Sequence, residues 1–320
     1  MRIILLSGAS FSIPSMNFFG NAKIIQSVAC IGQTDKENIH VEHSAALLNL
    51  PFKRFLKDQL LTEFKNWLGD EQPDMVLVFG CAYKIPEELF LIPKLGFFNV
   101  HFSLLPAYRG SNPLFWQLKN GDTAGGISIH QMTDEYDNGP ILIQQETPIF
   151  QGENHGLISN RLSLESIGLI AKGIEKLEHK NDFTLNEQSK NTSFGAPEPV
   201  LDDLKINWET QSAKEIENLV NAANPNFGGA VTVLRGQIIR ILEVNPAEIN
   251  NPSPVDPGTI VHSDTGYGIF VACKDMQFLR INILQSTECL LSGFKLASLG
   301  VAPGERFQSA AELSGISVKL

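Results

Sequence analysis

Three side chains near the middle of the sequence are of the types that can carry out acyl transfer: Asn99, His101 and Asp137. Asn99 lies in an apolar run, residues 97–100, whose pattern predicts a buried strand, and His101 comes directly after it. Because side chains alternate along a strand, we expect the amide and the imidazole to share one side. Open α/β sheets place their sites at the carboxyl ends of strands. Asp137 follows a later predicted strand, in the turn formed by residues 137–140, and we expect it to face the pair.

An amide, an imidazole and a carboxylate can transfer an acyl group without a serine or cysteine nucleophile. The Asn99 amide can donate to the oxyanion of a tetrahedral intermediate, a contribution of ~3–4 kcal/mol in the transition state. The His101 imidazole can take a proton from an attacking amine and pass it to the leaving nitrogen, which adds roughly 10²–10⁴-fold. Asp137 can orient the imidazole and stabilise its cation. A single buried His or Asp is more often structural, so the spacing alone leaves both interpretations open.

Strands that alternate with helices must position these residues. Compact apolar or alternating runs predict strands at residues 2–7, 23–31, 74–79, 97–100, 126–132 and 141–150. Helical spacing of apolar residues predicts helices at 44–50, 55–68, 111–118 and 157–177. This order is typical of an α/β domain with a doubly wound, mainly parallel sheet and helices on both faces. The glycine after the first strand is not part of a GxGxxG dinucleotide fingerprint.

The second part of the chain differs in composition and in its predicted secondary structure. Residues 188–203 are polar and contain two prolines, which predicts a linker between domains 1–187 and 204–320. A helix at 213–222 is followed by short predicted strands at 230–234, 237–244, 258–262, 268–273 and 278–284. Short strands at this spacing predict a small barrel.

Composition narrows the class of protein. The chain has 320 residues, with 25 Lys and Arg against 35 Asp and Glu, a formal charge of −10. This charge excludes a broadly basic surface that coats nucleic acid. The four cysteines form no CxxC pair, and no run is long enough for a signal peptide or a membrane span. We therefore expect a cytoplasmic protein of a reducing compartment that has no membrane partner.

A longer pattern surrounds the candidate trio. Residues 99–113 read NVHFSLLPAYRGSNP, and an Asp-x-Gly begins at Asp137. This ordered pattern resembles the signature of the folate-dependent formyltransferases. Residues 197–208 and 257–260, with the later GERF segment at 304–307, resemble the second domain of the methionyl-tRNA formyltransferases within that family. The resemblance covers nearly the full chain and is weakest over the first fifty residues.

The resemblance implies a Rossmann-like catalytic domain with a smaller OB-like barrel after it. It implies that Asn99, His101 and Asp137 are the catalytic trio and that 10-formyltetrahydrofolate is the donor, with no metal. The residues that it places around the folate come from three short stretches: Phe79, Gly80, Cys81, Ala82, Tyr83, Ser103, Leu104, Leu105, Pro106, Thr133, Asp134 and Glu135. Cys81 and Ala82 replace the usual Tyr-Gly of the family, and we interpret Cys81 as a small buried residue.

The acceptor amine remains open between two classes. Length and domain order favour the amino group of methionyl-tRNA. A nucleotide-linked amino sugar is the alternative, because residues 203–320 carry nine Lys and Arg against twelve Asp and Glu, a net charge of −3. The predicted loop 32–44, which in tRNA-formylating members is basic, has Lys36 as its only Lys or Arg. A formyltetrahydrofolate hydrolase, in which water replaces the amine, is a third hypothesis.

Several other polar residues have weaker claims. His130 lies on an alternating strand, and we interpret it as a structural strand residue. His40, Glu42 and His43 superficially suggest a metal site, but they lack an ordered third ligand. Arg109 is equally consistent with anion pairing and with a solvated turn.

Overall fold

The computed structural model describes residues 1–34, 36–179, 184–189, 195–250 and 253–309. It divides the chain into two compact units. The first comprises residues 1–113, 124–148 and 159–197, and the second comprises residues 114–123, 149–158 and 198–320. No helix among the described residues combines the length and the apolar character that crossing a membrane requires.

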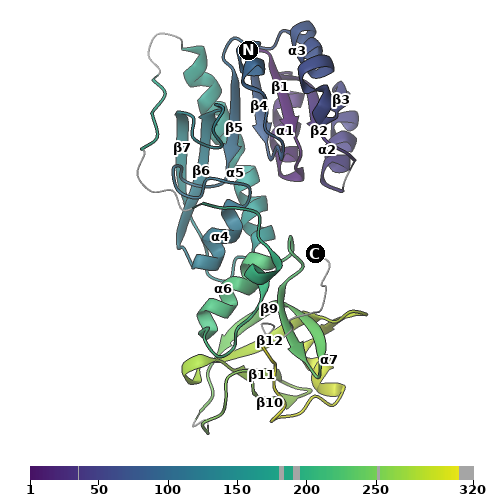
Figure 1. Cartoon of the computed structure of the whole chain (residues 1–320), viewed down its shortest axis with the longest axis vertical. Coiled ribbons are helices and arrows are strands. Elements are labelled where there is room, and N and C mark those ends of the chain that lie inside the picture. Colours follow the sequence, from purple (N-terminus) through teal and green to yellow (C-terminus); the bar gives the residue numbers. More distant parts are fainter. Residues whose placement is uncertain (35, 180–183, 190–194, 251–252, 310–320) are drawn as a thin grey trace. The chain divides into compact units, whose positions relative to one another are not determined.

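The first unit is built on a seven-stranded sheet (Figure 1). Its strands are β1 (Ile3–Ser7), β2 (Ile25–Ile31), β3 (Phe52–Phe55), β4 (Met75–Phe79), β5 (Phe97–His101), β6 (Ala124–Gln131) and β7 (Ile141–Pro148). Their order is β3-β2-β1-β4-β5-β6-β7, in which the first five strands are parallel to one another and the last two pairings, β5 with β6 and β6 with β7, are antiparallel. The prediction of a mainly parallel sheet with flanking helices is therefore confirmed.

Helices cover this sheet on both faces. They are α1 (Ile13–Asn21), α2 (Lys36–Leu47), α3 (Lys65–Glu71), with short turns η1 (Ser10–Ser12), η2 (Lys57–Gln59), η3 (Leu60–Phe64) and η4 (Glu87–Leu91). On one face, Ile4, Leu6, Val76 and Val78 pack with Phe64 and Trp67 of the η3–α3 segment. On the other face, Ser15 of α1 hydrogen-bonds Ser166 of α5 (His155–Glu178), so these two helices pack together.

Two local predictions in this unit were wrong. The segment predicted as the loop 32–44 is largely helical, because α2 begins at Lys36. Its buried positions Asn38, Val41 and Ala45 have helical spacing, but a polar residue at the first of them hides the pattern. Phe55, which the sequence assigned to the start of a helix, is the last residue of strand β3, and residues 52–54 of this strand had no prediction; the strand forms because it pairs in parallel with β2 at the sheet edge.

The second unit contains α4 (Pro113–Asn120) from residue 114 onward, α6 (Ala213–Ala223), the turn η5 (Leu201–Leu204) and an antiparallel sheet. The strands are β8 (Ala230–Leu234), β9 (Gln237–Ala247), β10 (Ile260–Asp264), β11 (Gly268–Ala272), β12 (Phe278–Gln285) and β13 (Leu290–Ser292), with η6 (Lys274–Met276) and α7 (Gly293–Ser298). Trp208 is fully buried among them, and its indole N–H donates to the Thr232 hydroxyl at 2.9 Å.

The predicted small OB-like barrel is not confirmed, because no closed barrel is found in the described part of this unit. The strand order is β10-β11-β12-β9-β8, so β10 and β8 lie at opposite ends of the order and do not pair with each other. Instead, Arg306 and Gln308 form single bridges to Thr259 and Val233. The described residues of this unit therefore form an antiparallel sheet whose edge strands do not pair with each other, while residues 304–308 hydrogen-bond to both edges.

Candidate active site

Strands β5 and β6 bring the first site residues together. Asn99 and His101 lie two positions apart on β5, with Val100 between them. The antiparallel register places Asn99 directly opposite His130 of β6, and His101 opposite Ser128. Residues paired in this way have side chains close enough to interact across the ladder. His130, interpreted from the sequence as a structural strand residue, therefore belongs to the site.

The Asp137 carboxylate is the point on which these side chains converge. Its Oδ1 lies 3.3 Å from Asn99 Nδ2, 3.4 Å from His130 Nε2 and 3.8 Å from His101 Nδ1. Its Oδ2 accepts a hydrogen bond of 2.9 Å from the Gly110 backbone N–H. The structure thus brings Asn99, His101 and Asp137 into one cluster, with His130 as a fourth member.

Backbone conformation in the turn after β6 holds Asp137 in place. Asp137 itself has φ of 49°, in the left-handed region that Asp and Asn enter more readily than most residues. Two residues later, a Cβ at Gly139 would lie only 1.8 Å from the Gln131 carbonyl oxygen. A glycine is therefore required for the turn to fold back against the end of β6.

The His101 ring has a defined orientation. Its Nε2 lies 2.9 Å from the Tyr108 carbonyl oxygen, which can only accept, so Nε2 carries the hydrogen. In the neutral ring, Nδ1 is then unprotonated, and this is the nitrogen nearer to Asp137. The expectation that Asp137 orients the imidazole needs refinement, because the Tyr108 carbonyl sets the tautomer. Nδ1 is the atom that can accept a proton.

Burial and neighbouring charges alter the ionisation of both groups. Burial lowers the pKa of His101 below its usual value, and the Asp137 carboxylate and the Tyr108 carbonyl offset this only in part. Burial alone would raise the pKa of Asp137, but the neighbouring His101 imidazole and the Gly110 N–H help to hold it below its ordinary range. At neutral pH the site therefore contains a neutral His101 beside an ionised Asp137, as a general base requires.

A second layer of contacts supports the turn. The Gln188 side-chain amide donates to the carbonyl oxygens of Asp137 and Gly139 at 2.8 and 2.7 Å. The Arg109 guanidinium in turn donates to Gln188 Oε1 at 2.6 and 3.1 Å. Sequence reasoning placed Gln188 in the linker and left Arg109 undecided. Only the fold shows that this pair braces the backbone of Asp137, since no local pattern connects positions so far apart.

The residues expected around the folate fall into two groups. Phe79 ends β4 and residues 80–83 follow it. Cys81 and Tyr83 pack on the same apolar cluster as Met132, which precedes residues 133–135. Tyr83 also lines a cavity of about 560 Å³ together with Gly32, Gln33 and residues 56–58. These two stretches thus border the same side of the sheet.

The stretch from Ser103 to Pro106 is occupied by hydrogen bonds within the protein. The Ser103 hydroxyl donates to the Ala107 carbonyl, the Leu105 N–H donates to the Ser128 hydroxyl, and the Leu105 carbonyl accepts from Gln144. This stretch, which includes Leu104, anchors the turn that presents the Tyr108 carbonyl to His101.

Two further sequence interpretations concern reactive groups outside the trio. Burial raises the pKa of the Cys81 thiol to about 11, so Cys81 stays protonated and is not a nucleophile at neutral pH. Glu42 forms an ion pair with Arg54 at 2.7 Å. Among the residues that the structure describes, no group of three His, Cys, Asp or Glu side chains is arranged to hold a metal ion.

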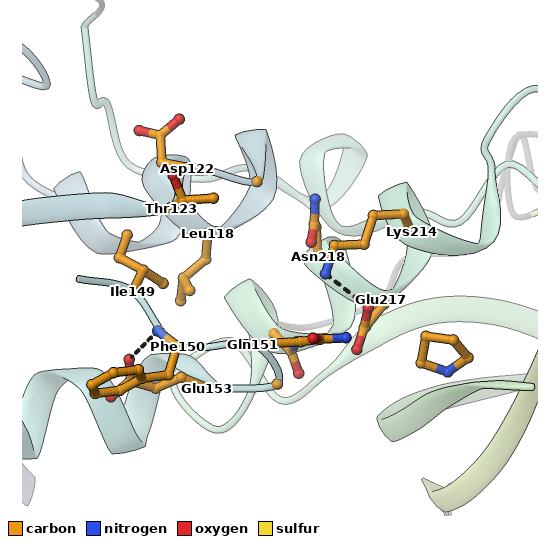
Figure 2. A pocket seen from close by; sticks show the side chains of 14 residues that line it. Leu118, Asp122, Thr123, Ile149, Phe150, Gln151, Glu153, Lys214, Glu217 and Asn218 are labelled. Carbon is orange, nitrogen blue, oxygen red and sulfur yellow. Dashed lines mark hydrogen bonds and ion pairs between the residues drawn. The ribbon is translucent and has the colours of Figure 1, made fainter.

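The second unit has a cavity of its own, of about 410 Å³ (Figure 2). It lies between the end of α4, residues 149–153 and α6. Its charged side chains are already engaged: Lys214 pairs with Glu217 at 3.0 Å, and Glu153 accepts from the Phe150 N–H at 3.1 Å. None of the trio lines this cavity.

Comparison with known proteins identifies the family of this chain. A family model described as formyl transferase matches residues 23–172, and one described as formyl transferase, C-terminal domain, matches residues 201–290. A methionyl-tRNA formyltransferase of Syntrophus aciditrophicus is 35% identical over 241 residues, covering 73% of this chain and 75% of the relative. One of Fusobacterium nucleatum is 29% identical, covering 92% and 96%. The chain therefore belongs to the formyl transferase family and is an enzyme of that type.

Solved structures share the fold at lower identity. HypX from Aquifex aeolicus in complex with tetrahydrofolic acid is 18% identical with a TM-score of 0.64, and the match covers 94% of this chain. The chain spans about half of the length of HypX, 47%. The sugar 3N-formyl transferase WlaRD is 16% identical with a TM-score of 0.62, and the match covers 90% of this chain and 98% of WlaRD.

Proposed function

We propose that this protein transfers the formyl group of 10-formyltetrahydrofolate to the amino group of methionyl-tRNA. The observation that carries the proposal is the convergence of Asn99, His101 and His130 on the Asp137 carboxylate, at 3.3 to 3.8 Å. This arrangement supplies a proton acceptor, an oxyanion donor and a counter-charge without a covalent nucleophile.

Each member of the trio has one task in this reaction. As the amine attacks the formyl carbon, Nδ1 of His101 takes the proton that the amine loses. The Asn99 amide donates to the formyl oxygen, where negative charge develops. Asp137 stabilises the imidazolium, whose Nδ1 is 3.8 Å from Oδ1. The proton then passes to the departing folate nitrogen as its bond to the formyl carbon breaks, which regenerates neutral His101.

The folate donor is proposed to bind beside the stretches 79–83 and 133–135. Backbone groups at the end of β4 and in the turn after β6 suit a flat heterocycle that has several donors and acceptors. HypX and WlaRD, which share the fold, are described with tetrahydrofolic acid and with 5-N-formyl-THF respectively. Both descriptions support a folate co-substrate for this chain.

Two observations bear on the acceptor. The relatives from Syntrophus and Fusobacterium are methionyl-tRNA formyltransferases, and the second matches nearly the whole chain, which favours the tRNA. The net charge of −3 over residues 203–320 favours instead a smaller acceptor, such as a nucleotide-linked amino sugar. We rank the tRNA first because the similarity to these enzymes extends over both units.

An acceptor screen with labelled 10-formyltetrahydrofolate tests the proposal. We expect label to enter initiator methionyl-tRNA and not a nucleotide-linked 3-amino sugar. Label in the sugar alone would replace the proposed acceptor by the alternative. A gel-shift at ~50 mM salt gives a second readout, since electrostatic affinity for tRNA is strongest at low salt. Absence of a complex there would count against the tRNA.

A further inference from the structure

Three atoms of the active site form a nearly equilateral triangle. Asn99 Nδ2 is 3.3 Å from His130 Nε2 and 3.3 Å from Asp137 Oδ1, and these two acceptor atoms are 3.4 Å apart. His130 Nδ1 lies 3.0 Å from the Gln131 carbonyl oxygen. Since a carbonyl can only accept, Nδ1 carries a hydrogen, and since Asn99 Nδ2 can only donate, Nε2 is the acceptor of the hydrogen bond between the two side chains.

This pattern determines how the Asn99 amide is turned. Both neighbours of the amide, the His130 Nε2 lone pair and Asp137 Oδ1, need a donor, so the nitrogen and not the oxygen of the amide faces them. The two acceptors lie about 60° apart as seen from Nδ2, whereas the two hydrogens of a planar amide diverge by about 120°. One hydrogen is therefore shared between both acceptors, and the other points away from them.

We propose that His130 is a positioning residue that holds the Asn99 amide with one N–H directed to the formyl oxygen. The inference rests on the proposed function, because it names what aligns the oxyanion donor of that reaction. His130 is 1% exposed, and the groups that face it are Asn99, Asp137 and the His101 ring, whose centroid is 6.4 Å away and nearly perpendicular. Without the imidazole, Asp137 alone holds the amide, and the amide is free to turn about its terminal bond.

Two substitutions at position 130 separate positioning from packing. His130→Leu keeps an apolar side chain of similar size but removes the acceptor, and we expect kcat to fall about ten- to a hundredfold, within the loss of a whole oxyanion donor. The KM for the folate should stay unchanged. His130→Gln restores an acceptor at similar reach, so it should recover most of kcat. Equal loss of kcat in both variants, with native thermal unfolding, would overturn the role.

A double-mutant cycle with Asn99→Ala completes the test. If His130 acts through the Asn99 amide, His130→Leu should have no further effect on kcat once that amide is gone. A full additional loss in the Asn99→Ala background would contradict the proposal. His155→Gln is the matched control, because His155 is also buried but packs against Phe227, and we expect its kcat to equal that of the wild type.

The assay distinguishes this inference from the proposed function. Formyl transfer by the wild-type protein to methionyl-tRNA is measured first, and its absence would reject the proposed function. A fully active wild type together with a fully active His130→Leu variant would reject only the role of His130.

Discussion

The site in the first unit and the cavity in the second unit differ in what their charged groups do. At the site, one amide nitrogen and two imidazole nitrogens lie within 3.8 Å of one carboxylate oxygen, Asp137 Oδ1. In the cavity, each charge has its own partner, as Lys214 has Glu217 (Figure 2). The cavity is large and its charged side chains are paired. The site is closely packed with ionisable groups whose protonation states depend on one another.

One buried histidine from each unit, His101 and His155, makes the same point. His101 lies beside a carboxylate and a backbone carbonyl, and it remains able to accept a proton. His155, near the start of α5, packs against Phe227 without a carboxylate, and burial lowers its pKa to about 4. Burial alone therefore yields an inert imidazole. A buried imidazole that accepts a proton also needs a neighbouring negative charge. Cavity volume alone therefore does not locate the site.

Removal of the His101 imidazole should give the largest effect and sharpen this comparison most. His101→Ala should lower kcat by roughly 10²–10⁴-fold, the usual contribution of general acid–base catalysis. Folate affinity, measured by isothermal titration with a non-reactive folate, should be retained because the ring binds protons rather than the donor. A variant with unchanged turnover would refute the assignment of the base.

The acid side of the pH profile tests the environment of His101. The base works only when neutral, and burial lowers its pKa below 6.5, so activity should be constant from pH 6.5 towards pH 8. Below that pKa, kcat should fall by about tenfold per pH unit for each proton that inactivates the enzyme. Single-turnover rates across this range provide the measurement. A fall that begins above pH 7 would mean that the counter-charge outweighs burial.

Substitution of Gln188, which with Arg109 holds the backbone of Asp137, should have a smaller effect, mainly on the stability of the fold. Gln188→Leu leaves the backbone carbonyls of Asp137 and Gly139 without their donor, and it should cost about 1–3 kcal/mol in the free energy of unfolding. Urea unfolding followed by circular dichroism measures this loss. Gln188→Glu is the matched control, since it keeps the shape but replaces the donating amide by an acceptor, and it should be no more stable than Gln188→Leu.

The cavity of the second unit should give the smallest effects. Lys214 is more than half exposed, so Lys214→Ala should cost no more than about 1 kcal/mol of stability. We expect kcat for formyl transfer to stay within about twofold of the wild type, because the cavity lacks the features that define the site. A loss of kcat as large as that of His101→Ala would contradict this contrast and indicate that the cavity takes part in the reaction.

Local patterns of the sequence predicted much of this arrangement. Apolar runs such as Ile3–Ser7 and Met75–Phe79 predicted the parallel strands, because strands buried on both faces must be apolar throughout. The Asn-Val-His end of β5 and the Asp-Asn-Gly-Pro turn predicted the candidate trio from residue type and alternation. These features depend on neighbours within a few positions, which the sequence displays directly.

Other features depended on distant partners, and only the tertiary structure decided them. His130 looked structural until the antiparallel register of β5 and β6 placed it opposite Asn99. Gln188 and Arg109 looked like linker and surface until the fold joined them behind Asp137. The sequence by itself determined which residues could do the chemistry, because residue type and strand period are local. The tertiary structure determined which atoms share a hydrogen bond, because strand register and long-range contacts have no signature in any single segment.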